Sequence, residues 1–292
     1  MQKLLIEYQK YIEESLSENT MFSYMSDLKN FLSKNSINSQ KELSKLRYEN
    51  VEGYIMILRN SGMAYSSISR NIASLRKFFC FCVEKGIMKS DLTDEIKLPN
   101  KQRKLPNTIS PDEVVKLLES PDISTIKGIR DKAMLELMYA TGARVSEIIN
   151  LRINDISLKN EMVMLSTSGK HRFVPLGRIA IDALLNYVKD ARDKFTPLGD
   201  SGYLFLNFSG KPLSRQGFWK IIKHYIELCG IGGNVTAQTL RHSFALHLLK
   251  NGADIESVTE MLGYSDVSST KIYIDVMNNK IKEVYQNAHP RA

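Results

Sequence analysis

The chain has 292 residues, which suits two domains better than one, and its 43% hydrophobic and 25% charged residues are ordinary for a soluble globular protein. No apolar run approaches the roughly 18–20 residues needed to span a bilayer, and acidic residues make the N-terminal stretch a poor signal peptide, so we expect a cytoplasmic protein without a membrane segment. The three cysteines lack metal-ligand spacing and argue against structural disulfides, while the net charge of +8 is a weak indication of a nucleic-acid partner.

The first 90 residues are expected to form a helical N-terminal domain. Residues 16–34 begin with candidate helix caps at Ser17, Asn19 and Thr20, and apolar side chains then recur at helical spacing. Residues 63–86 carry a second apolar stripe of this spacing before Gly86: Tyr65, Ile68, Ile72, Leu75, Phe79 and Cys82.

The opposite face of this second helix is polar. Small hydroxyl and amide groups alternate there with basic side chains, a mixture that suits contact with DNA phosphates. We therefore take Arg70, Asn71 and Lys77 as candidate DNA-binding residues. A merely solvated helix face is the alternative.

Residues 91–107 are expected to form a basic linker between two domains. Pro99 and Pro106 keep such a segment extended, and it has little apolar content. An extended basic segment can follow a nucleic-acid backbone, so Lys101, Arg103 and Lys104 are further candidate DNA-binding residues.

Residues 108–292 are expected to form a mostly helical second domain. Ser110, Pro111 and Glu113 have the pattern of a capped helix start. Residues 161–177 alternate around a Ser-Gly turn and predict a β-hairpin. Further helices are expected at residues 130–141, 144–156, 178–194, 214–229, 235–250 and 254–262, and around Tyr273.

Four phrases in the second domain follow one another in a characteristic order. They are YATGARVSEIINL around Arg144, LFLNFSGKPLSRQGFWKIIKHY at 204–225, QTLRHSFALHLLKNGADIESVTEMLG around Arg241 and SSTKIYIDV around Tyr273. This set resembles the tyrosine recombinases, or phage integrase family, and most closely the Xer group of bacterial chromosome-dimer resolvases, over almost the whole chain. The resemblance implies a mainly α fold with a small β-hairpin or sheet in the second domain. It also implies a two-domain, C-shaped DNA clamp of a helical, SAM-like core-binding domain and a catalytic domain.

The resemblance also implies a reaction. Enzymes of this family cut DNA by attack of a tyrosine on the scissile phosphate, which leaves a 3′-phosphotyrosyl link, and a freed 5′-hydroxyl reseals the strand without ATP, metal or other cofactor. Arg144 and Arg241 match the family's two arginines, whose guanidinium groups can hold charge on the non-bridging oxygens. Tyr273 matches the nucleophile, and a phenol with a pKa of about 10 needs help to lose its proton.

The chain departs from the family at the groups that transfer protons. The hairpin lysine, which protonates the leaving 5′-oxygen in the family, falls on Ser168, and a shift of the turn would let Lys170 serve instead. Gln238 stands where the family has a histidine, and Tyr264 stands where it has a histidine or tryptophan. Glutamine can hydrogen-bond a phosphate oxygen but cannot act as a general base near pH 7, whereas a tyrosine hydroxyl can still donate a hydrogen bond.

Another histidine could replace the missing base. His171, beside Lys170 on the hairpin, is the candidate. His242 follows Arg241 directly and so points about 100° away from it around a helix, which predicts a structural role. The same role is expected for His247.

Three functions are open at this point. An active Xer-type recombinase would bind double-stranded DNA as a tetramer on two sites, alone or with a paralogous recombinase, and residues 278–292 are candidates for docking into a neighbouring protomer. A catalytically impaired paralogue would keep the fold and bind DNA without useful chemistry. A basic helical interaction protein without a DNA role fits the ordered phrases least.

Overall fold

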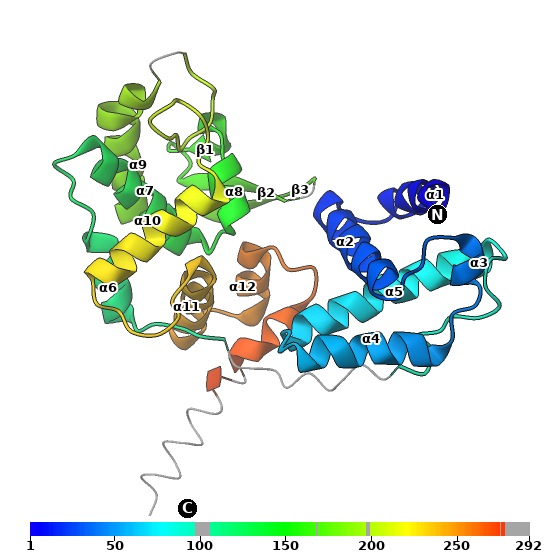
Figure 1. The fold of residues 1–292 in the computed structure, drawn as a ribbon. Helices are drawn as coiled ribbons and strands as arrows, with labels where there is room; N and C mark the ends of the chain where they lie inside the picture. Colours follow the sequence, from blue (N-terminus) through cyan, green and yellow to red (C-terminus); the bar gives the residue numbers. More distant parts are fainter. Residues whose placement is uncertain (97–105, 168, 197–198, 275, 278–292) are drawn as a thin grey trace, which may run out of the picture. The chain divides into compact units, whose positions relative to one another are not determined.

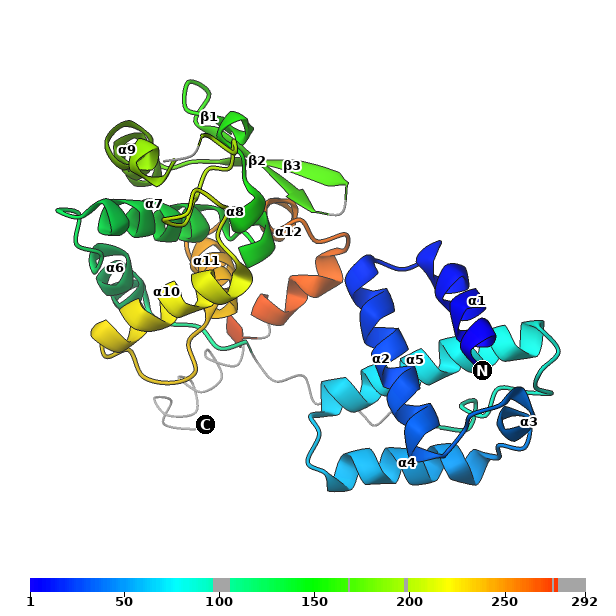
Figure 2. The same cartoon turned by 45° about the horizontal axis from the view of Figure 1, so that its top comes forward.

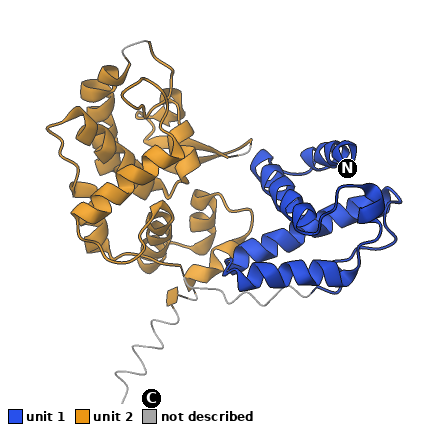
Figure 3. Ribbon diagram, viewed as in Figure 1, with its two compact units in different colours: residues 1–103 blue, residues 104–292 orange. Residues whose placement is uncertain are grey.

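The computed structural model describes residues 1–96, 106–167, 169–196, 199–274 and 276–277. The chain divides into two compact units, Met1–Arg103 and Lys104–Ala292 (Figure 3). The candidate residues Lys101, Arg103, Lys104 and Ser168, and the candidate docking segment 278–292, lie outside the described residues. The predicted domain boundaries at 90 and 108 stay a prediction.

The first unit is built of helices only (Figure 1). They are α1 (Gln2–Glu13), α2 (Glu18–Lys34), α3 (Gln40–Leu43), α4 (Tyr48–Asn60) and α5 (Tyr65–Glu84). Ser17 caps α2, as predicted, by accepting a hydrogen bond from the backbone N–H of Thr20. Past the end of α5, Gly86 adopts a left-handed conformation with a φ of 69°, which stops the helix.

The core of the first unit is rich in aromatic side chains. The ring of Tyr8 packs edge-on against Phe78 at a centroid distance of 5.0 Å, and Phe31 packs edge-on against Phe79 at 5.9 Å. The predicted apolar stripe of α5 lies in this core, since five of its six members are buried: Ile68, Ile72, Leu75, Phe79 and Cys82.

The second unit is mostly helical, which confirms the predicted mainly α fold class (Figure 1). Its helices are α6 (Pro111–Glu119), α7 (Ile126–Thr141), α8 (Val145–Asn150), α9 (Arg178–Asn186), α10 (Arg215–Leu228), α11 (Ala237–Lys250) and α12 (Ile255–Leu262). Short 3₁₀ turns lie at Ile153–Asp155, Arg192–Phe195 and Val267–Ser269, and a π turn lies at Tyr187–Ala191. Throughout the described part of the chain, every helix is too short or too polar to cross a membrane.

Two predicted helices differ from the structure at their C-terminal ends. α8 ends at Asn150 rather than near residue 156, because Leu151 turns extended and Arg152 pairs in a β-bridge with Tyr203. The helix expected to reach residue 194 is regular only to Asn186 and continues as the π and 3₁₀ turns. The start of α6 is as predicted, with Ser110 and Glu113 forming a capping box.

The sheet of the second unit has three antiparallel strands in the order β1 (Ile156–Ser157), β2 (Met162–Thr167) and β3 (Lys170–Pro175) (Figure 2). β2 and β3 form the predicted hairpin, with Thr167 paired to Lys170 across the turn. Val163, Leu165 and Val174 are buried on one face. The sequence did not predict β1, which is only two residues long.

Helix α7 lies at the centre of the second unit and packs against α6, α9 and α11. A smaller apolar cluster joins α11 to α12 and to the segment that follows it, through Phe244, Leu246, Val258, Leu262 and Tyr273. The packing therefore places the segment around Tyr273 against α11.

Candidate active site

Arg144 is positioned by the break between α7 and α8. Gly142 ends α7 in a left-handed conformation with a φ of 58°, and a Cβ atom at this position would lie 2.4 Å from the ring of Phe244. Arg144 is then the N-cap residue of α8, and its backbone N–H donates to Oε2 of Glu147 at 2.6 Å. The break thus fixes the direction in which the Arg144 side chain leaves the backbone.

Arg241 lies in the first half of α11 and is almost completely buried. Its Nη1 donates to the carbonyl oxygen of Gly142 at 2.5 Å, and its Nη2 donates to the carbonyl oxygen of Leu262 at 2.6 Å. These carbonyls belong to the C-terminal ends of α7 and α12, where a positive charge is favourable. Burial lowers the pKa of the Arg241 guanidinium below its ordinary value, and Tyr264 opposes that change.

The two arginines meet at the ring of Tyr264. The guanidinium carbon of Arg241 lies 4.9 Å from the ring centroid, and that of Arg144 lies 5.7 Å from it. Both distances are within the range of a cation–π interaction. Tyr264 follows Gly263, which ends α12 in a left-handed conformation with a φ of 63°. The structure thus brings Arg144, Arg241 and the altered family position Tyr264 together.

Tyr273 lies beside this pair with its side chain buried, at 0% exposure. Its Oη is 2.7 Å from Nδ1 of His242 on α11. Burial, and then the neighbouring Tyr264, raise the pKa of the Tyr273 phenol, and Arg241 opposes this rise. Burial, and then Arg241, lower the pKa of His242, so its imidazole is neutral at pH 7.

His242 was missed as a site residue, and the expectation that it points away from the site is wrong. The segment around Tyr273 packs on the side of α11 that carries His242, so the rotation of about 100° from Arg241 turns the imidazole toward the phenol. Gln238, one turn earlier on α11, is exposed, and its Nε2 lies 3.2 Å from Nε2 of the same imidazole. The sequence shows that His242 follows Arg241, but it could not show that Tyr273 packs beside His242.

Glu147 is a second residue that the sequence did not mark for the site. Its buried carboxylate accepts hydrogen bonds from Nη1 and Nη2 of Arg172 at 2.6 and 2.9 Å, from Nη1 of Arg144 at 3.2 Å, and from the hydroxyl of Thr167. Burial alone would raise the pKa of Glu147, but the hydrogen bonds from Arg172, Thr167 and the Arg144 backbone outweigh it and lower the pKa to about 2. The ionised carboxylate of Glu147 therefore links the hairpin to Arg144.

Lys170 is the first residue of β3 and is exposed beside the hairpin turn. His171, the predicted stand-in base, is also exposed, and its Nδ1 is 2.7 Å from Oγ of Ser166 on the same hairpin. Its hydrogen bond is thus made within the hairpin, whereas His242 makes the contact with Tyr273.

The DNA-binding candidates of α5 differ in exposure. The Arg70 side chain is 45% exposed and donates to Oδ1 of Asp27 at 3.1 Å, and Lys77 lies 5.0 Å from the ring of Tyr11. Asn71 is only 3% exposed and accepts a hydrogen bond from the hydroxyl of Tyr54, so its expected place on the polar face is wrong. The helix spacing could not show that α4 covers this side of α5.

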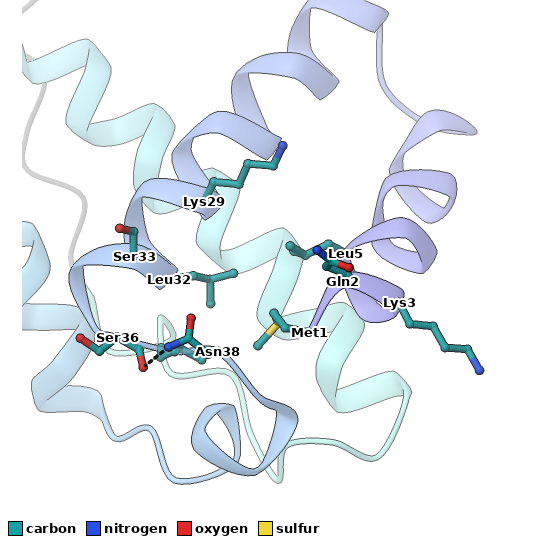
Figure 4. A pocket seen from close by; sticks show the side chains of 10 residues that line it. Met1, Gln2, Lys3, Leu5, Lys29, Leu32, Ser33, Ser36 and Asn38 are labelled. Atoms are coloured by element: carbon teal, nitrogen blue, oxygen red, sulfur yellow. Dashed lines mark hydrogen bonds between the residues drawn. The ribbon is translucent and has the colours of Figure 1, made fainter.

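A cleft of about 820 Å³ lies between α1 and the end of α2 in the first unit (Figure 4). Lys3 and Lys29 are its charged side chains. None of the residues predicted for the catalytic site or for DNA binding lines it: its lining is Met1, Gln2, Lys3, Leu5, Lys29, Leu32, Ser33, Ser36, Ile37 and Asn38.

Known proteins match the chain over nearly its whole length. Residues 107–280 match the model of the phage integrase family, and residues 5–86 match that of its N-terminal SAM-like domain. The tyrosine recombinase XerD of Listeria innocua serovar 6a is 41% identical over 284 residues, which cover 96% of each chain. The tyrosine recombinase XerD of Oceanobacillus iheyensis is 43% identical over 284 residues, which cover 96% of this chain and 95% of the relative.

Solved structures share the fold. The XerH site-specific recombinase in a post-cleavage complex with a palindromic difH substrate has a TM-score of 0.77 at 21% identity, with 96% of this chain and 94% of that chain covered. A lambda integrase dimer bound to a COC′ core site has a TM-score of 0.73 at 17% identity, with 94% of each chain covered. At these identities the likeness concerns the arrangement of the helices and strands.

Proposed function

The chain belongs to the phage integrase family of tyrosine recombinases, and we propose that it carries out Xer-like site-specific DNA recombination with Arg144, Arg241 and Tyr273 as its catalytic residues. The observation that carries the proposal is the position of both guanidinium groups over the ring of Tyr264, at 5.7 and 4.9 Å, beside the Tyr273 phenol. Two positive charges next to a nucleophilic oxygen suit the attack of that oxygen on a phosphodiester.

The two arginines hold the scissile phosphate. A guanidinium has five N–H donors, and Arg241 uses one on each of Nη1 and Nη2 for the carbonyl groups of Gly142 and Leu262. Arg144 is half-buried and bonded to Glu147 through Nη1. Both side chains therefore keep donors for the non-bridging oxygens, whose charge grows in the transition state.

Cleavage and religation each exchange one phosphorus–oxygen bond for another. The oxygen of Tyr273 forms a bond to phosphorus, and the bond from phosphorus to the 5′-oxygen breaks. The leaving oxygen takes a proton, for which the ammonium group of Lys170 is the donor. A 5′-hydroxyl of another strand later attacks the phosphotyrosyl link, returns a proton and restores the tyrosine. Tyr264 adds a hydroxyl donor beside the phosphate.

The partner is double-stranded DNA, which is supported by the difH substrate bound in the XerH structure and the COC′ core site bound in the lambda integrase structure. Arg70 and Lys77, with the linker residues Lys101, Arg103 and Lys104, contribute phosphate contacts. Four protomers act on two DNA sites, in the cytoplasm, either as one kind of chain or with a paralogue. Residues 278–292 dock into the neighbouring protomer.

A DNA duplex with a nick beside the scissile phosphate tests the proposal. Cleavage of this substrate releases a short fragment that cannot religate, so the covalent adduct accumulates and is seen as a denaturant-resistant band. We expect an adduct with the wild-type chain, none with Tyr273→Phe, and DNA binding by both. Binding without any adduct in the wild type would contradict the proposal and favour the catalytically impaired paralogue, an alternative supported by Gln238.

A further inference from the structure

We propose that His242 is the general base that takes the proton from Tyr273, and that Gln238 is the positioning residue that holds its imidazole in the required tautomer. The inference rests on the proposed function, because it assigns a step of the same reaction. It gives a chemical role to the one imidazole that contacts the nucleophile within the described residues.

The distance fits direct proton transfer. Nδ1 of His242 and Oη of Tyr273 are 2.7 Å apart, inside the range of about 2.6–3.2 Å that a general base requires. The two rings are tilted, with centroids 5.7 Å apart and an interplanar angle of 56°. His171, by contrast, has its hydrogen bond to Ser166 on the hairpin.

Gln238 decides which nitrogen of His242 carries the proton. As the side chain is placed, the amide nitrogen Nε2 of Gln238 lies 3.2 Å from Nε2 of the imidazole. When the amide nitrogen donates to Nε2, the neutral ring has its proton on Nδ1 and can only donate to the phenol oxygen. A half-turn of the amide presents its oxygen, which accepts from Nε2–H and leaves Nδ1 free to accept the phenol proton. A glutamine at this position can thus orient a base although it cannot be one.

The surroundings of the pair favour a neutral base at rest. Arg241 precedes His242 on α11 and, after burial, lowers its pKa. The one carboxylate described at this site, that of Glu147, is paired with Arg172 and Arg144. A scissile phosphate held by the two arginines would bring negative charge to this place. The imidazolium that forms would then be stabilised by the phosphate and by the oxygen of Gln238.

The proposed step is balanced in atoms and electrons. The proton of Tyr273 Oη passes to Nδ1 of His242 while Oη bonds to phosphorus and the bond to the 5′-oxygen breaks. The 5′-oxygen takes a proton from Lys170 or from water. In religation the incoming 5′-hydroxyl gives its proton to the group that protonated the leaving oxygen, Lys170 or water, and His242 returns its proton to Oη, so the chain ends in its starting state.

A substrate with sulfur in place of the bridging 5′-oxygen separates the base from the acid, because a thiolate leaves without protonation. We expect His242→Gln to slow adduct formation about 10² to 10⁴-fold on the oxygen substrate. The same loss should remain on the sulfur substrate, whereas the loss in Lys170→Ala should be relieved. His247→Gln, on the same helix and hydrogen-bonded to Tyr139, is the matched control and should retain the wild-type rate. Thermal unfolding and DNA binding of each variant show whether it is folded.

The role of Gln238 has its own readout, the ¹⁵N chemical shifts of the His242 ring in the DNA-free protein. We expect the His242 ring to carry its proton on Nε2 in the wild type and in Gln238→Glu, and to be a mixture of tautomers in Gln238→Met. Cleavage should be roughly tenfold slower in Gln238→Met and unchanged in Gln238→Glu. An Nδ1–H tautomer in the wild type, or a normal rate for His242→Gln, would overturn the inference while leaving the proposed function intact. An inactive wild-type chain would overturn both, so the two failures are told apart by the wild-type adduct.

Discussion

Nη1 and Nη2 of Arg172 donate hydrogen bonds to the two carboxylate oxygens of Glu147, at 2.6 and 2.9 Å. The same carboxylate accepts a hydrogen bond from the backbone N–H of Arg144, so the hairpin and Arg144 are held by one buried carboxylate. Nε of Arg172 also donates to the carbonyl oxygen of Met261 on α12, at 2.6 Å. Arg172 on β3 therefore connects α8 and α12 to the hairpin. The bond to Glu147 on α8 requires that this carboxyl group stays ionised.

The acid dependence of unfolding should reveal that ionisation. The pKa of Glu147 falls from its ordinary 4.5 to about 2 on folding. Its stabilising contribution is thus complete above about pH 5 and is lost as the pH falls from 4.5 toward 2. We expect the wild type to lose about 1.4 kcal/mol more than Glu147→Gln between pH 6 and pH 3.5, measured by urea unfolding. Parallel pH profiles of the two proteins would contradict this.

Loss of the other partner should be costly for the same reason. Arg172→Ala leaves a buried carboxylate without its main partner, and we expect the free energy of unfolding to fall by about 3–5 kcal/mol. Arg178, whose side chain is 83% exposed, pairs with Asp182 on the surface, so Arg178→Ala is the matched control and should cost less than about 1 kcal/mol. Equal losses in the two variants would refute the role given to burial.

Gly142 should tolerate no side chain, because a Cβ there would lie 2.4 Å from Phe244. Gly230 has nearly the same backbone, with a φ of 62° against 58°, but nothing lies within 4 Å of its Cβ position. Gly230→Ala should therefore report only the cost of the left-handed conformation, about 1 kcal/mol, and Gly142→Ala should cost at least 2 kcal/mol more. Thermal unfolding of both variants measures the difference.

The ring and the hydroxyl of Tyr264 should contribute separately to cleavage. Tyr264→Phe keeps the face on which Arg144 and Arg241 lie but loses the donor, and we expect adduct formation to slow about tenfold, the effect of roughly one hydrogen bond. Tyr264→Leu loses both and should slow it a further tenfold or more. Identical rates for the two variants would show that the ring face has no part in holding the arginines.

The sequence predicted the features that depend on neighbours along the chain. The capping box of Ser110, the end of α7 at Gly142 and the β2–β3 hairpin are local patterns, and each is found. The proximity of Arg144 and Arg241 was expected only from the family resemblance, since spacing alone cannot bring residues on different helices together.

The contacts made across the fold were not predicted. Glu147 meets Arg172, and His242 meets Tyr273, because of how β3 and the segment after α12 pack, and a helical wheel contains no such information. Asn71 was placed on the wrong side for the same reason, since only the packing of α4 on α5 buries it. The partners of Glu147 and His242 were therefore the part of the candidate site least accessible from the sequence.

Tyr273 is completely buried, and this limits the reactivity of its phenol while no target DNA is bound. An oxygen enclosed by its own protein cannot react with a stray phosphodiester, however high the local concentration of DNA. For the proposed attack on phosphorus, the contacts that bury the Tyr273 oxygen have to open first. On the proposed function, the timing of strand cleavage therefore depends on the event that exposes the Tyr273 oxygen.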